Sequence, residues 1–179
     1  MIVASLKPNL TRTAAAQLLD TKWQKWRRGS LRAVLDFYIP YRLFRVATTM
    51  RGKPTQIFLA LDLVTGHLAP YHFDEPLAED AQLSIETERR APVGIDEATA
   101  LASLNDRVMR LAFMNGIFKI RRFRFAAEPI ADFYLPYWIG VFERGGAVEL
   151  EAIDAVRGRL EGAKIREIAV EWFQRSGRK

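Results

Sequence analysis

The stretch "DFYIPY" at residues 36–41 recurs as "DFYLPY" at residues 132–137, an offset of 96 positions. Around both copies, every second residue is apolar or aromatic: Phe37, Ile39, Tyr41 and Leu43 in the first copy, and Phe133, Leu135, Tyr137 and Ile139 in the second. Alternation with a period of two is typical of β-strands. The sequence therefore predicts the same strand twice.

Each copy continues into a second strand. "QIFLALDLVTGHL" from Gln56 and "VELEAIDAVRGRL" from Val148 align at an offset of 92, because the turn "ATTMRGKPT" is longer than its counterpart "ERGG". Further turns are marked by an aspartate, which bonds nearby backbone amides, and a glycine, which tolerates positive φ. These residues are Asp62 with Gly66, and Asp154 with Gly158. A third strand after each turn completes a predicted antiparallel meander.

A helical pattern precedes each meander. "TRTAAAQLLDTKWQKWRR" places Ala15, Leu18, Leu19, Trp23 and Trp26 at helical spacing, and "GIDEATALASLNDRVMRLAF" does the same with Leu101, Leu104, Val108 and Leu111. We predict an α+β fold of two tandem repeats, each a helix followed by a three-stranded meander, related by a pseudo-twofold axis. The repeats are 1–75 and 95–179, and residues 76–94 form an acidic connector. For residues 159–175, strand and helix both stay open.

The hairpin "ALDLVTGHL", and more loosely "AIDAVRGRL", resembles the close of a PepSY-type module, whose last hairpin commonly reads Asp-x-x-Thr-Gly-x-aliphatic. Arg157 stands in the second copy where that pattern has threonine. The resemblance covers about a third of each half. It implies a cystatin-like arrangement of a helix on a sheet, and a binding or regulatory role rather than catalysis.

Composition limits the chemistry of the chain. It has 179 residues, of which 49% are hydrophobic and 27% charged, as in ordinary globular proteins. The lack of cysteine excludes disulfides, thiol nucleophiles and thiolate metal sites, and it favours a reducing compartment, so we expect the cytoplasm. Neither an export signal nor a membrane span is predicted from the hydropathy pattern.

The net charge of +6 is unevenly distributed. Residues 1–55 hold 11 basic and 2 acidic residues, whereas residues 56–106 hold 2 basic and 10 acidic residues. The acidic segment is therefore a candidate counter-charge for the basic N-terminal part, through residues such as Glu79, Asp80, Glu86 and Glu88. The other possibility is an anionic partner.

Two basic stretches contain aromatic residues. They are "KWQKWRR", with Lys22, Lys25, Arg27 and Arg28, and "FKIRRFRF", with Lys119, Arg121, Arg122 and Arg124. Exposed aromatics would stack on bases while the cations neutralise phosphates. In the alternative interpretation, the aromatics point inward and the cations form an ordinary solvated or salt-bridged face.

The strands offer candidate ligand residues and a candidate interface. A bulged, aromatic-rich pair of strands predicts a groove lined by Tyr38, Tyr41, Tyr134, Tyr137 and Trp138, for which core packing is the alternative. Ile57 and Leu59 of the first hairpin align with Glu149 and Glu151 of the second. The face that carries Ile57, Leu59 and Leu61 is therefore apolar, whereas the equivalent face of the second hairpin is charged. We expect the glutamate face to be wet. The apolar face must be covered by the other half, the connector or a second subunit, and a homodimer is preferred.

Catalytic and metal-binding signatures are weak. Asp36 and Asp132 form a conceivable acid/base pair if the symmetry brings them together, but neither lies in an Asp-Thr/Ser-Gly loop. His67 and His72 lie near Asp74 and Glu75 in the sequence, but their spacing on a strand would put the two side chains on opposite faces, which disfavours a metal site. Nucleotide-binding and nucleophile motifs are missing. We therefore expect a non-catalytic protein without a cofactor, which binds another protein, a second copy of itself or a small ligand. Nucleic-acid or anionic-surface binding is the alternative, and a hydrolase is third.

Overall fold

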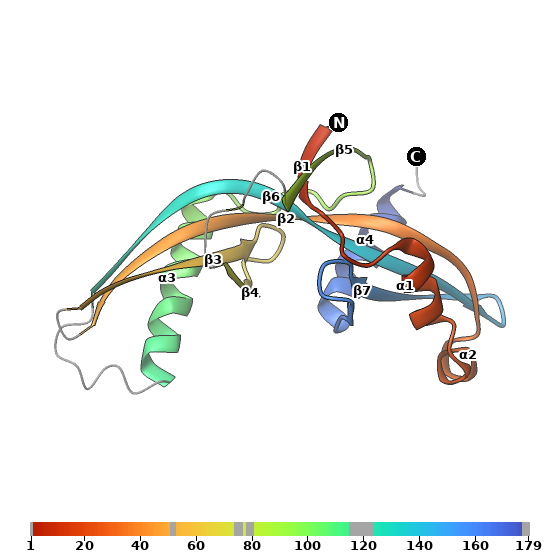
Figure 1. The fold of residues 1–179 in the computed structure, drawn as a ribbon. Helices are drawn as coiled ribbons and strands as arrows, with labels where there is room; N and C mark the ends of the chain where they lie inside the picture. Colours follow the sequence, from red (N-terminus) through yellow and green to blue (C-terminus); the bar gives the residue numbers. More distant parts are fainter. Residues whose placement is uncertain (1, 51–52, 74–76, 78–80, 115–123, 177–179) are drawn as a thin grey trace. The chain divides into compact units, whose positions relative to one another are not determined.

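The computed structural model describes residues 2–50, 53–73, 77, 81–114 and 124–176 (Figure 1). Within these residues the chain forms four helices and eight strands, in an α+β fold with a mixed, mostly antiparallel sheet. The elements are β1 (Ile2–Leu6), α1 (Arg12–Leu19), α2 (Lys22–Arg28), β2 (Ser30–Met50), β3 (Lys53–Asp62), β4 (Leu68–Phe73), β5 (Gln82–Glu86), α3 (Glu97–Met114), β6 (Arg124–Arg144), β7 (Ala147–Asp154), β8 (Arg159–Leu160) and α4 (Ala163–Ser176). The segment left open between strand and helix is therefore the short β8 followed by α4.

Two compact units divide the chain, and they do not follow the order of the sequence. Unit 1 comprises residues 1–39, 82–91 and 134–179, and unit 2 comprises residues 40–81 and 92–133. The strands β2 and β6 each contribute residues to both units, so the units do not coincide with the segments 1–75 and 95–179. The expected connector, 76–94, contains β5, which pairs with β1.

Both predicted meanders are present. β2, β3 and β4 pair antiparallel in order, as do β6, β7 and β8. Tyr41 lies opposite Asp62 in the first meander, and Tyr137 lies opposite Asp154 in the second. The register of the repeated motif is therefore the same in both hairpins.

The turns after the two hairpins share their hydrogen bonds. Asp62 Oδ1 accepts from the backbone N–H groups of Val64 and Thr65, at 2.7 and 3.3 Å. Asp154 Oδ1 accepts from the two equivalent N–H groups at 2.8 Å each. The glycine that ends each turn has a φ near +70°, at 70° for Gly66 and 68° for Gly158. Both predicted aspartate–glycine turns are thus formed.

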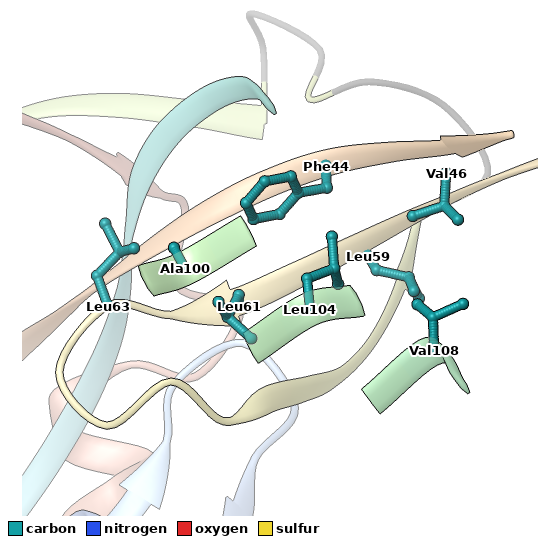
Figure 2. Packing of buried hydrophobic residues seen from close by; sticks show 8 residues of the cluster. All are labelled: Phe44, Val46, Leu59, Leu61, Leu63, Ala100, Leu104 and Val108. Atoms are coloured by element: carbon teal, nitrogen blue, oxygen red, sulfur yellow. The ribbon is translucent and has the colours of Figure 1, made fainter. Parts of the chain in front are cut away.

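In unit 2, α3 packs against the hairpin of β2 and β3 (Figures 1 and 2). The packing is amphipathic: one stripe of α3 meets one face of the hairpin. The core residues are Phe44, Val46, Leu59, Leu61, Leu63, Ala100, Leu104 and Val108. Leu59 and Leu61 are therefore buried by a helix of the same chain, and their burial requires no second subunit. Ile57 is 40% exposed.

In unit 1, α1 packs against β6 and β7. Ala15 and Leu19 of α1 form a core cluster with Phe142 and Ile153. α4 also contacts β7, and its Trp172 lies 5.6 Å from the ring of Phe37. Each hairpin is thus covered by the helix that precedes the other hairpin in the sequence, an exchange that the order of elements does not reveal.

Candidate binding surface on helix α2

Two capped ends position α2. α1 ends at Leu19, and Thr21 begins a new helix because its hydroxyl accepts from the N–H of Gln24 at 3.2 Å. The other end is at Gly29, with φ of 92°, where a Cβ atom would lie 2.2 Å from the carbonyl oxygen of Glu143. Only glycine fits this close approach, and it holds the end of α2 against the β6–β7 turn.

The inner side of α2 is fixed by buried ion pairs. Arg28 is 6% exposed and contacts Glu149 at 3.0 Å and Glu151 at 2.5 Å. Arg166 of α4 also reaches Glu151, at 3.1 Å. The expectation that the Glu149/Glu151 face is wet is therefore wrong for Glu151, which is 5% exposed. Glu151 is buried because Arg28 pairs with it, as in the salt-bridged alternative for the first basic stretch.

The outer side of α2 carries the two tryptophans. Trp23 is 56% exposed and Trp26 is 77% exposed, and Lys22 and Arg27 beside them are exposed as well. Successive helical residues are rotated by about 100°, so Lys22, Trp26, Trp23 and Arg27 follow one another around an arc of about 140°. We call these four residues the tryptophan face. The guanidinium of Arg27 lies 5.1 Å from the centroid of Trp23, in a cation–π contact.

The charge around this face is positive. Arg144 donates to the carbonyl oxygen of Arg27 at 3.0 Å, which brings a further cation to the end of α2. Nearby carboxylates are already neutralised: Asp20 pairs with Lys25, and Glu143 pairs with Arg32, each at 2.9 Å. The first basic stretch therefore forms an exposed cationic and aromatic surface, except for Arg28.

The second basic stretch is described only at its end. Lys119, Arg121 and Arg122 lie outside the described residues, and Arg124 is the first residue of β6.

Cations of the basic N-terminal part pair mainly with acids from outside the acidic segment. Their carboxylate partners within the described residues include Asp20, Glu128, Asp132, Glu143, Glu149 and Glu151, while Glu97 belongs to the acidic segment. Glu79 and Asp80 lie outside the described residues. The acidic segment thus supplies one of the observed counter-charges through Glu97.

The five candidate groove residues are largely interior. Tyr38, Tyr41 and Tyr137 are at most 7% exposed, and Tyr41 stacks on Phe133 with the ring centroids 6.0 Å apart. Trp138 is partly buried and donates from Nε1 to the carbonyl oxygen of Leu10 at 2.8 Å. Burial, and next the charge of Asp36, raises the pKa of the Tyr38 hydroxyl. Tyr41 belongs to unit 2, whereas Tyr38, Tyr134, Tyr137 and Trp138 belong to unit 1.

The two equivalent aspartates have separate arginine partners. Asp36 contacts Arg89 and, at 3.4 Å, Arg12. Asp132 receives two hydrogen bonds from Arg42, at 2.6 and 2.7 Å. Bidentate pairing of this kind fixes a carboxylate as an acceptor. Both aspartates therefore act as ion-pair acceptors in their own units.

Metal and membrane features were sought among the described residues. This part of the chain holds no group of three or more His, Cys, Asp or Glu side chains arranged to bind a metal ion. None of its helices is both long and apolar enough to cross a bilayer. His67 Nδ1 lies 3.1 Å from the hydroxyl of Thr65, within the turn after β3.

Comparisons with known proteins return no match among family models, curated proteins or solved structures. The PepSY-type resemblance therefore stays a prediction.

Proposed function

We propose that the protein is a non-catalytic binding protein that contacts an anionic macromolecule or an anionic surface through the tryptophan face. The observation that carries this proposal is the exposure of Trp23 and Trp26 on a helix whose inner side is fixed by Arg28. Leaving a large apolar side chain in water forfeits about 1.5–3 kcal/mol relative to burying it. A rigid surface that exposes two such residues among cations is typical of a contact surface.

The finer architecture that we propose is a duplicated module in which the two copies exchange their helices, with the pseudo-twofold relation predicted from the sequence. Recurring backbone contacts support it. The N–H groups of Asn9 and Leu10 donate to the carbonyl oxygen of Ala155 at 3.0 and 2.8 Å. The N–H groups of Gly94 and Ile95 donate to that of Leu63 at 2.8 and 3.1 Å.

Asn9 and Leu10 thus correspond to Gly94 and Ile95 at an offset of 85 positions. The same offset holds for further contacts of the two lead-in segments, which are the residues that precede α1 and α3. Ser5 pairs in parallel with Tyr134, and Arg90 pairs in parallel with Tyr38, so the lead-in residues are again 85 positions apart and their strand partners 96. Thr11 caps α1 and Asp96 accepts from Thr99 at the start of α3 at 2.7 Å, also at an offset of 85. The helical segments can therefore be compared residue by residue.

This comparison indicates where the copies diverge. At the offset of 85, Trp23 corresponds to Val108, which is 6% exposed in the core of unit 2. α3 continues without interruption through this region, whereas the first copy breaks between Leu19 and Lys22. With this break, Trp23 faces solvent, whereas its counterpart Val108 is buried. In a duplicated protein, the surface that only one copy has is the best candidate for a function that the other copy does not share.

A protein partner, including a second copy of the chain, is the second candidate. Tryptophan and arginine are enriched among the residues that dominate protein interfaces, so Trp26 and Arg27 suit that role as well. The proposed homodimer has no basis at Leu59 and Leu61, which are buried by α3. Catalysis by Asp36 and Asp132 ranks third, because each carboxylate is already paired with arginine.

The proposal is tested with a panel of three anionic probes: an oligonucleotide, vesicles containing anionic phospholipid, and poly-glutamate. We expect at least one probe to bind the wild-type chain with an affinity that falls as salt rises. The variant Trp23→Ala/Trp26→Ala removes the apolar part of the face, and Leu160→Ala, at a 54% exposed apolar residue of β8, is its matched control. Equal binding by the two variants, or no binding of any probe by the wild type, would refute the proposal.

A further inference from the structure

The tryptophan face projects outward rather than lining a groove. The groove beside α2 has a volume of about 420 Å³ and is lined by Arg28, Glu149, Arg166 and neighbouring residues of β7 and α4. Trp23 and Trp26 are not among its lining residues. The partner of the face must therefore receive two protruding indoles, instead of inserting into the protein.

The order of side chains around α2 suits a flat interface that is apolar at its centre and anionic at its margins. Trp26 and Trp23 occupy the middle of the arc, and Lys22 and Arg27 flank them on either side. Indole rings prefer the headgroup level of a bilayer, where the ring is in the apolar layer and the N–H is near water. Lysine and arginine reach phosphates from the same depth through their long side chains.

A single nucleic-acid strand fits this surface less well. Binding to such a strand combines a groove that follows the backbone with aromatic faces on which bases stack. The guanidinium of Arg27 covers the Trp23 ring, where a base would have to stack. The groove beside α2 is lined by the carboxylates of Glu149, Glu167 and Glu171 as well as by Arg28 and Arg166. This groove is therefore not the uniformly cationic track that a phosphate backbone follows.

We infer that the tryptophan face docks α2 into the headgroup layer of a bilayer that contains anionic phospholipid. This inference rests on the proposed function and names its partner. The indoles of Trp23 and Trp26 enter the interface, and Lys22 and Arg27 lie over the phosphates. The ion pairs of Arg28 keep the helix attached to β7 while it does so.

Co-sedimentation with vesicles tests the inference, with pure phosphatidylcholine compared with a mixture of phosphatidylcholine and phosphatidylglycerol. We expect the wild type to sediment with the mixed vesicles, and high salt to weaken this binding. Trp23→Ala/Trp26→Ala should lower partitioning at least about tenfold. Each cation replaced in Lys22→Gln/Arg27→Gln should lower it about fivefold.

Two controls separate this face from general effects of charge and apolar exposure. Arg110→Gln removes an exposed cation of α3 in unit 2, and Leu160→Ala removes an exposed apolar side chain of β8. Both should sediment like the wild type. Circular dichroism of every variant establishes whether it is folded. We expect the tryptophan variant to fold, because Trp23 and Trp26 are exposed.

The outcomes distinguish the inference from the proposed function. In one outcome, the wild type fails to sediment with mixed vesicles and still binds an oligonucleotide or poly-glutamate through its tryptophans. That result overturns docking on a bilayer and keeps the proposed function. Failure to bind any of the three probes overturns both. Sedimentation that is unchanged in the tryptophan variant overturns the assignment of the face.

Discussion

Replacing Arg28 with methionine tests whether buried charge holds α2 in place. The Arg28 side chain is 7% exposed and faces Glu151, whose side chain is 6% exposed. Removing one partner of a buried ion pair costs about 3–5 kcal/mol, because the other charge stays behind without compensation. Arg166 still contacts Glu151 at 3.1 Å in the variant, so we expect the lower end of this range, about 3 kcal/mol.

The matched control is Arg110→Met. Arg110 pairs with Asp106 at 3.5 Å, and both side chains are more than three-quarters exposed, at 78% and 77%. An exposed pair contributes about 0–1 kcal/mol, so this variant should lose less than about 1 kcal/mol. A large difference between two Arg→Met substitutions then measures burial rather than the loss of a positive charge.

Urea unfolding provides the assay, followed by far-UV circular dichroism and by tryptophan fluorescence. Coincident transitions are needed before a single free energy of unfolding is assigned, because the chain has two compact units. The double variant Arg28→Met/Glu151→Leu removes both buried charges and should regain at least half of the loss. An Arg28→Met variant that loses no more stability than Arg110→Met would refute the buried-charge reasoning.

Three further predictions concern turns and pH. Gly29→Ala should destabilise the protein by more than about 2 kcal/mol, because φ is 92° and the added Cβ would meet the backbone of Glu143. Gly145→Ala, at a positive φ but with open space around the Cβ, should cost about 1 kcal/mol in the same urea assay. Asp62→Ala and Asp154→Ala should each cost about 1–3 kcal/mol, because each leaves two turn N–H groups without an acceptor; losses that differ by more than twofold would argue against equivalent turns. Burial, and next the charge of Asp154, raises the pKa of Glu161 above its ordinary value of 4.5. The folded state therefore holds this proton more tightly than the unfolded state, and the stability that this group contributes is lost as the pH rises through the raised pKa. Glu161→Gln should therefore raise the urea midpoint at pH 7 and flatten its decline as the pH rises above 4.5. An unchanged pH profile would show that this carboxyl does not contribute.

Local sequence patterns predicted the strands and turns well. The alternation around Phe37 and Phe133 and the Asp–Gly pairs after β3 and β7 specify structure within a few residues, so a pattern in the sequence is enough. The two meanders and both aspartate turns are confirmed for this reason. The helix exchange was missed because it depends on which hairpin a helix reaches, and spacing along the chain carries no such information.

The proposed binding surface could be predicted only in part. The basic and aromatic content of 22–28 was visible, but its helical spacing continued that of α1, which favoured inward-pointing tryptophans. Thr21, a common helix N-cap residue following Asp20, is the local signal for the break that turns Trp23 outward. Glu151 was misassigned to water because burial of a charge depends on its partner, and that partner, Arg28, is 123 positions away in the sequence.

The most direct test of the binding surface is iodide quenching of Trp23 and Trp26 in a Trp138→Phe/Trp172→Phe background. Both remaining indoles are exposed in the free protein, at 56% and 77%, so iodide should quench them efficiently. On addition of mixed phosphatidylcholine and phosphatidylglycerol vesicles, we predict that quenching falls sharply, whereas pure phosphatidylcholine vesicles should have a much smaller effect. Quenching that is unchanged by the mixed vesicles, while the background variant remains folded by circular dichroism, would contradict docking of the tryptophan face on an anionic bilayer.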